Sequence, residues 1–111
     1  MIHIINQKAI QQQVNEMLEE LDPLIKLAVD IRRNILAGGG PMHVDCEGVL
    51  IQNGSRQEDI WGANWISATL TVEYEALINI RPKQQNSSMT IQDPTIRQKV
   101  ETVVRQLLEG V

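Results

Sequence analysis

The feature that most constrains the fold is a period-two alternation of apolar and polar residues between residues 72 and 81. Successive residues of a strand point to opposite faces of a sheet, so this run predicts a strand over 70–81 with one buried face. The other face would carry Glu75, Asn79 and Arg81 in a row. The predicted core face consists of Val72, Tyr74, Ala76, Ile78 and Ile80.

A second strand is predicted over 60–65, interrupted by Gly62, and a loop joins it to the strand over 70–81. Trp61 and Trp65 are four residues apart, so they share one face of this strand, and Asp59 would share it too. Two tryptophans beside polar residues suit stacking on a ligand or burial in a partner interface. They equally suit the core, because the chain has no phenylalanine.

Residues 24–37 fit two patterns. With period two they form a hairpin, in which Asn34 adopts the left-handed conformation that a three-residue loop needs. With period 3.6 they form a helix, in which Asp22 is the cap and Pro23 the first helical residue. The β-branched content favours the hairpin, and the helix stays as the alternative.

Three helices are predicted elsewhere. The first covers about 10–21 with Asn6 as its cap, and the third begins at Asp93-Pro94 and ends at Gly110. The second begins near Pro41 and ends at Asn53-Gly54, although a short strand over 49–52 is the alternative there. The predicted class is α+β in the order helix, hairpin, helix, hairpin, helix, with about four antiparallel strands covered on one face by helices.

The bulk composition limits the class of protein. A chain of 111 residues with 42% hydrophobic residues predicts a single compact domain, 1–111, without a membrane segment. The single Cys46 and the absence of a signal-peptide pattern indicate a protein made and kept in the cytosol. A net charge of -4 argues against a duplex nucleic-acid partner. Between residues 81 and 99, however, four cations face one acid, which suits a small anion.

Long strings of this sequence resemble a small bacterial family that is catalogued only as a domain of unknown function. The resemblance covers nearly the whole chain. It implies a compact single-domain bacterial protein and favours strands over 24–37, but it brings no catalytic residue, substrate or cofactor. The strings that carry it are AGGGPMHVDCE (37–47), GSRQEDIWGANW (54–65), LINIRP (77–82) and SMTIQDPTIR (88–97).

Arg81 and Asn79 form the first candidate site. Arginine offers a planar fork for a carboxylate or phosphate, and asparagine offers both a donor and an acceptor. Arg97, at the start of the last helix, and the polar loop 86–88 are expected nearby. The structural alternative is an ordinary ion pair of Arg81 with Glu73, Glu75 or Asp59.

His43 and Glu47 form a second candidate site, for a metal. They lie one turn apart on the predicted second helix, and Asp59, Glu75 or His3 would have to complete the ligand set. The structural alternative makes His43 a surface group, with acids placed at a helix start to suit the dipole.

Two functions follow from these candidates. The leading hypothesis is a non-catalytic binding module without a cofactor, using Asp59, Trp61, Asn79, Arg81 and Arg97. Its expected partner is a protein, including a second copy in a homodimer, or a small anionic ligand. The rival is a small metal-dependent hydrolase or nuclease that uses His43 and Glu47 with Asp59 or Glu75. No serine lies in a nucleophile elbow, and Cys46 falls at a predicted buried position, so a nucleophilic enzyme is disfavoured.

Overall fold

A computed structural model describes all residues, 1–111, and confirms the α+β class with three helices. Three short 3-10 turns, Gln57–Asp59, Leu77–Asn79 and Pro82–Gln84, lie in the second half of the chain. The helices and strands are β1 (His3–Ile5), α1 (Gln11–Met17), β2 (Leu24–Asp30), β3 (Ile35–Gly38), α2 (His43–Gln52), β4 (Ile60–Ile66), β5 (Thr71–Glu73) and α3 (Pro94–Leu108).

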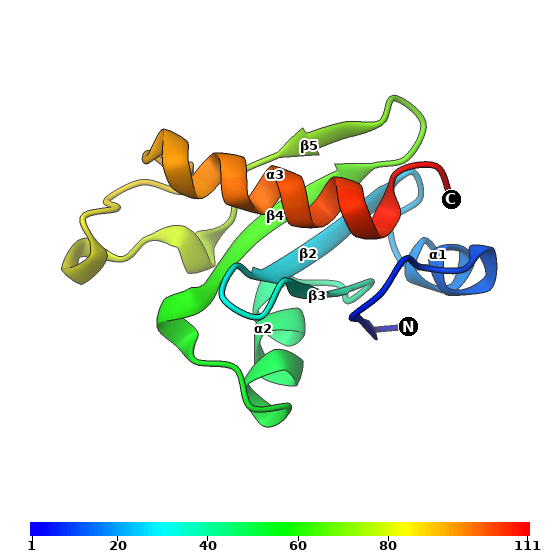
Figure 1. Cartoon of the computed structure of the whole chain (residues 1–111), viewed down its shortest axis with the longest axis horizontal. Coiled ribbons are helices and arrows are strands. Elements are labelled where there is room, and N and C mark those ends of the chain that lie inside the picture. Colours follow the sequence, from blue (N-terminus) through cyan, green and yellow to red (C-terminus); the bar gives the residue numbers. More distant parts are fainter.

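The five strands form one antiparallel sheet in the order β1-β3-β2-β4-β5 (Figure 1). The two predicted hairpins share this sheet because β2 pairs with β4 along its whole length, from Leu24 opposite Ile66 to Asp30 opposite Ile60. The strand β1 was not predicted. It is only three residues long, and Ile4 pairs with Ala37 of β3.

The hairpin over 24–37 is confirmed, and the helical alternative is wrong. Asn34 has a φ of 57°, as the three-residue loop requires. The fully buried Asp30 supports the same turn, since its Oδ1 accepts the backbone N–H groups of Arg32 and Arg33, each at 2.9 Å. An Asp side chain that accepts N–H groups two and three residues further along the chain stabilises a tight turn.

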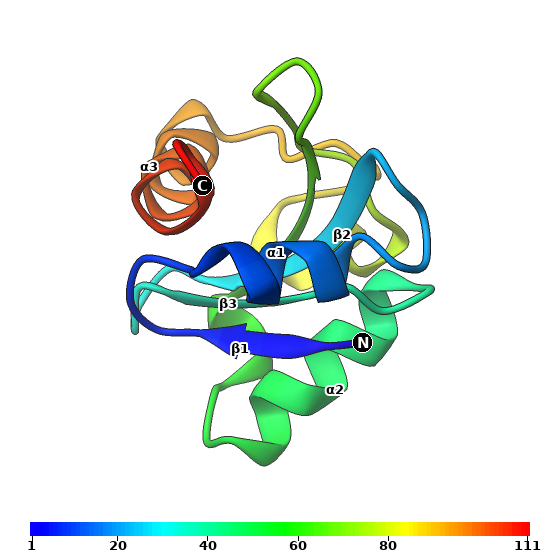
Figure 2. The same cartoon turned by 90° about the vertical axis from the view of Figure 1, so that its right-hand side faces the viewer.

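Helices cover both faces of the sheet, so the prediction of one covered face is wrong (Figure 2). Leu27 and Val29 of β2 face a large core built with α1 and α3, which also contains both tryptophans. Ala28, between them, faces a smaller core with Cys46 and Leu50 of α2. The small residues on this second face let α2 lie close to the sheet. No helix is both long and apolar enough to span a bilayer.

The predicted helices are confirmed with one correction to their ends. Asp93 caps α3, its Oδ1 accepting the N–H of Thr95 at 2.7 Å. The second helix is present as α2, and Gly54 follows it with a φ of 103°. Asn6, however, is not the cap of α1, because the strand β1 ends at Ile5 and the helix begins only at Gln11.

The strand predicted over 70–81 is wrong beyond its first residues. β5 ends at Glu73, and residues 77–79 form a 3-10 turn instead. The alternation of apolar and polar residues arises because Ala76 and Ile78 pack over Gly62, while Asn79 turns inward rather than toward solvent. Trp61 and Trp65 are only 1% and 2% exposed, which confirms their place in the core.

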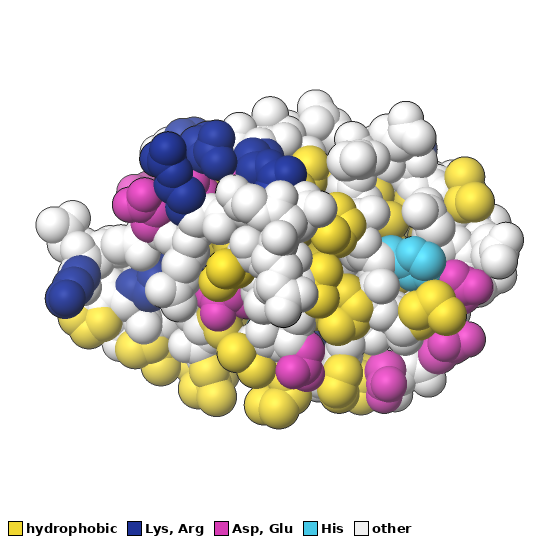
Figure 3. Space-filling view, turned by 90° about the horizontal axis from the view of Figure 1, so that it is seen from below, with side chains coloured by type: hydrophobic (Ala, Val, Ile, Leu, Met, Phe, Trp, Pro, Cys, Tyr) yellow, Lys and Arg dark blue, Asp and Glu magenta, His cyan; other side chains and the backbone are white.

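Large exposed hydrophobic side chains concentrate on and beside α2. Seen from the α2 side, hydrophobic groups recur over the middle of the face and along its lower edge, while Lys and Arg gather at its upper left and left (Figure 3). Scattered exposed hydrophobics are normal on a soluble protein, but a cluster marks an interaction surface. Six of the ten such residues lie on α2 or across from it: Met42, Val44, Ile51, Leu77, Ile80 and Met89.

Candidate functional site

The segment that follows β5 is fastened to the sheet by the side chain of Asn79. This asparagine is completely buried. Its Oδ1 accepts the N–H of Gly62 at 2.8 Å, and its Nδ2 donates to the carbonyl of Gly62 at 3.0 Å. The same Nδ2 also lies 3.2 Å from the carbonyl oxygen of Tyr74 and 3.1 Å from that of Met89. Asn79 therefore pairs with β4 as the backbone of a further strand would.

Asn86 has the same role for the residues of this segment that lie farther from the sheet. Its Nδ2 lies 2.7 Å from the carbonyl oxygen of Asn79 and 3.0 Å from that of Thr90, and its Oδ1 accepts the N–H of Gln92 at 2.8 Å. Buried polar groups are costly unless they are paired, so two buried and fully bonded asparagines define one conformation for this segment. Residues 77–92 thus form a fixed platform beside α2.

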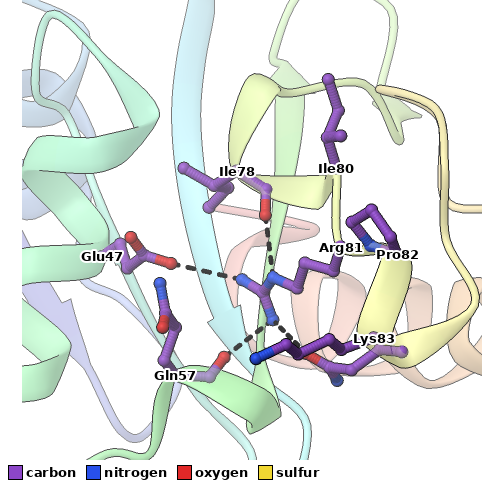
Figure 4. Close-up of a pocket in the computed structure, with 8 residues that line it drawn as sticks. Glu47, Gln57, Ile78, Ile80, Arg81, Pro82 and Lys83 are labelled. Atoms are coloured by element: carbon purple, nitrogen blue, oxygen red, sulfur yellow. Dashed lines mark hydrogen bonds and ion pairs between the residues drawn. The ribbon is translucent and has the colours of Figure 1, made fainter.

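Arg81 connects this platform to α2. Its Nη2 lies 3.2 Å from Oε2 of Glu47, and both side chains are less than a tenth exposed. Its Nε donates to the carbonyl of Ile78 at 2.9 Å, and its Nη1 donates to the carbonyl of Gln57 at 2.7 Å (Figure 4). The guanidinium carbon lies 4.9 Å from the ring centroid of Trp61, within cation–π range.

Arg81 therefore links the platform to α2, and its guanidinium is largely occupied by contacts within the protein. Burial lowers the pKa of Arg81, and the charge of Glu47 raises it, but a guanidinium stays protonated at neutral pH. Four acceptors, the Gln84 Oε1 at 3.4 Å among them, occupy most of its five N–H donors. Removing one member of such a buried pair typically costs about 3–5 kcal/mol.

A cavity of about 560 Å³ opens beside the ion pair of Arg81 and Glu47. Its apolar wall is formed by Ile78, Ile80 and Pro82, and its polar wall by Arg81 and Lys83 with Glu47 and two glutamines. Lys83 has no ion-pair or hydrogen-bond partner in the chain, and it extends toward the same side of the cavity as Arg81 (Figure 4). Glu47 neutralises Arg81, so Lys83 leaves this cavity with one net positive charge.

A smaller cavity of about 280 Å³ continues along α2 and shares Ile78 with the first. It is mostly apolar, and Met42, Val44, Leu77 and Met89 are among its lining residues. Lys26, at its base, also has no ion-pair or hydrogen-bond partner through its side chain. We call the two cavities together the α2 groove, a depression lined by α2 on one side and by residues 75–84 on the other.

The residues that make up this platform and groove lie within one family model. Residues 3–107 match the model described as "Protein of unknown function (DUF5674)". The chain belongs to the DUF5674 family. No curated protein and no solved structure matches it. The match runs from the first residue of β1 into the last turn of α3, so the whole sheet and the α2 groove are part of the family's domain.

The structure brings three of the five predicted binding residues of this DUF5674 chain together. Trp61, Asn79 and Arg81 are neighbours, although Trp61 and Asn79 are buried beneath the surface. Asp59 instead pairs with Arg32, the Oδ2 and Nε atoms being 2.9 Å apart. Arg97 lies on α3 beside Tyr74, 6.0 Å from its ring centroid, and lines a different hollow.

The metal ligands predicted for the rival function do not converge. Glu47 binds Arg81, whereas His43 donates from Nε2 to Oδ1 of Asn64 at 2.8 Å and lies 3.1 Å from the carbonyl oxygen of Ala63. No three His, Cys, Asp or Glu side chains lie close enough together to hold a metal ion. The proposed ligand set is therefore wrong for a geometric reason.

Burial shifts the pKa of both His43 and Cys46. Burial lowers the pKa of His43, and its hydrogen bonds to Asn64 and Ala63 offset only part of that effect. Burial also raises the pKa of Cys46, which keeps the thiol protonated and poorly nucleophilic. Cys46 is completely buried in the small core under α2.

Sequence reasoning missed most of the groove. Glu47 was considered as a metal ligand or as an acid at a helix start, and Lys83 only as one of four cations between residues 81 and 99. Ile78 and Ile80 were placed in the core, but Ile80 is 45% exposed. The one signal that could have identified the site is the density of cations after Arg81 in an acidic chain.

Proposed function

We propose that this protein is a non-catalytic binding module that holds a short segment of a partner protein in the α2 groove. The segment would place a carboxylate at Lys83 and an aliphatic side chain against Ile78 and Ile80. The observation that supports this most directly is the position of Lys83, a cation without a partner, beside the apolar wall of a cavity of about 560 Å³. Binding sites are typically of this size, mostly apolar, with a few polar groups that fix orientation.

The wall of the groove is suited to recognition because it is already ordered. Asn79 and Asn86 fix the platform, and Arg81 fixes its distance from α2. A preformed site loses little conformational entropy when a ligand binds, which favours affinity. Arg81 itself would act on a bound segment through its electrostatic field rather than through hydrogen bonds, since its N–H donors are occupied by acceptors of the protein.

The groove consists of two adjoining cavities. The two cavities share Ile78, and each is lined by a lysine without a partner, Lys83 in the larger cavity and Lys26, together with Glu75, in the smaller. An extended segment with apolar side chains in both cavities fills this shape better than a compact ligand does. The uncompensated charge of Lys83 beside the apolar wall favours a segment that carries a carboxylate near apolar residues.

Selection from random peptides displayed on phage tests this function. We expect the wild-type protein to enrich peptides in which Asp or Glu stands next to aliphatic residues. Lys83→Ala should remove the preference for the acid, and Ile80→Ser should remove the preference for the aliphatic residue. Lys99→Ala, which removes an exposed lysine from α3, is the matched control and should leave the selected sequences unchanged.

Two results would count against this function. One is enrichment of peptides without an acid, or no enrichment at all. The other is equal loss of binding in Lys83→Ala and Lys99→Ala, because that would indicate a general effect of charge rather than a site at Lys83.

A further inference from the structure

The outward side of α2 exposes two large apolar residues beside the polar Asp45 and Gln52. Val44 is 51% exposed and Ile51 is 44% exposed, and the spacing of residues 44, 48 and 51 places them on one side of the helix. The opposite side holds the buried Cys46 and Leu50. A surface helix normally has a polar outer face. In the same molecule α3 follows that rule, with the exposed Gln98, Thr102 and Gln106 on its outside.

Gly48 lies at the centre of this outward face, and the chain itself does not require a glycine there. A Cβ atom at Gly48 would meet nothing within 4 Å, whereas one at Gly62 would lie 2.4 Å from the Cβ of Ala76. Glycine is less favourable than alanine inside a helix, and its other use is to let a second backbone come close. The space above Gly48 is open in the single chain.

We propose that the outer face of α2 packs against α2 of a second copy of the chain, with the two helices antiparallel and crossing at Gly48. A two-fold axis beside Gly48 would place Val44 of each copy against Ile51 of the other. Such an interface is self-complementary, as two-fold interfaces must be. This surface goes beyond the peptide site: Gly48 and Ile51 line neither cavity, and Val44 lies at the border between them and the smaller cavity, which it also lines.

The charges around α2 favour a second copy in the antiparallel direction. Asp45 lies in the first turn of the helix. Near the other end lie two arginines. Arg33 donates to Oδ1 of Asn53 at 2.9 Å and to Oγ of Ser55 at 2.8 Å and has no ion-pair partner, and Arg56, 67% exposed, lies 3.9 Å from the carboxylate of Glu58. Antiparallel packing brings Asp45 of each copy toward Arg33 and Arg56 of the other and also opposes the helix dipoles.

Sedimentation velocity over a concentration series tests the proposal with Gly48→Ala. The added methyl group should weaken dimerisation about tenfold or more, because it fills the place of closest approach. It should also raise the melting temperature of the dilute monomer, because alanine is the better helix residue. These opposite effects separate a contact at Gly48 from a loss of folding. Gln106→Ala, on the outer face of α3, is the matched control and should leave dimerisation unchanged.

Charge reversal tests the direction of packing. Asp45→Arg should weaken the dimer, and adding Arg56→Asp in the same chain should restore it, since each copy then carries both changes. A wild-type chain that stays monomeric at every concentration overturns the proposal. So does a Gly48→Ala chain that dimerises as tightly as the wild type, and failure of the double variant to recover overturns the antiparallel arrangement.

Discussion

Replacing Asn79 with alanine should be among the most destabilising changes that leave the hydrophobic core intact. The side chain is fully buried, and its amide is the partner of both backbone groups of Gly62, at 2.8 and 3.0 Å. After Asn79→Ala, the N–H and the carbonyl of Gly62 lose these bonds in a place that water does not reach. The carbonyls of Tyr74 and Met89 lose less, because they keep bonds to the N–H groups of Ile91 and Ala76.

The expected loss of stability follows from the hydrogen bonds that this change removes. A buried polar group that loses its only partner costs about 1–3 kcal/mol. Two such groups on Gly62, with the small cavity left by the amide, give a loss of about 3–5 kcal/mol in the free energy of unfolding. The total for a domain is about 5–15 kcal/mol, so this one amide accounts for a large share of the stability.

Urea unfolding followed by tryptophan fluorescence measures this loss, since both tryptophans lie in the core. Asn6→Ala is the matched control: Asn6 is exposed, its side chain has no hydrogen bond, and the change should cost less than about 0.5 kcal/mol. A loss below about 1 kcal/mol for Asn79→Ala would refute the argument from unpaired backbone groups.

Asn79→Asp separates the amide's donors from its shape. The carboxylate would keep an acceptor for the N–H of Gly62 but would turn an oxygen toward three carbonyls. Burial and these carbonyls would raise its pKa in the folded state, so protonation would favour folding. We expect its deficit relative to the wild type to shrink as the pH falls, and a deficit that does not change with pH would contradict this geometry.

Two further predictions concern the neighbouring residues. Gly62→Ala should cost about 1–3 kcal/mol in urea unfolding, because its Cβ would lie 2.4 Å from the Cβ of Ala76; a neutral effect would mean that the platform can move away. His43 should make stability fall as the pH drops below about 6.5, because burial lowers its pKa and the unfolded chain then binds more protons. His43→Gln should flatten that slope, and an unchanged slope would assign it to another group.

The sequence predicted those elements whose pattern depends on their own residues. The helix α3 has a long amphipathic repeat and an Asp-Pro start, and the hairpin of β2 and β3 has β-branched strands and Asn34 at its turn. β1 has only three residues, which is too short for any periodicity, so its pairing with β3 was not visible.

The candidate site was predicted only in part, because its geometry depends on contacts between distant residues. Arg81 was identified, but its partner Glu47 is 34 positions away and was assigned to a metal. Asn79 looked exposed because alternation placed it on a polar face. A side-chain amide that pairs with backbone produces no period in the sequence, so the inward turn at residues 77–79 could not be inferred from spacing alone.

The amide of Asn79 also has a consequence for how this sheet meets other chains. β5 covers β4 only from Asn64 to Ile66, which leaves the earlier residues of β4 at an open sheet edge. Unpaired edge groups recruit strands from other molecules and start aggregation. Here Asn79 occupies the donor and acceptor of Gly62 without presenting a new strand of its own. At Gly62 the edge of the sheet is therefore closed by a side chain, so an incoming strand finds no free backbone N–H or carbonyl there with which to pair.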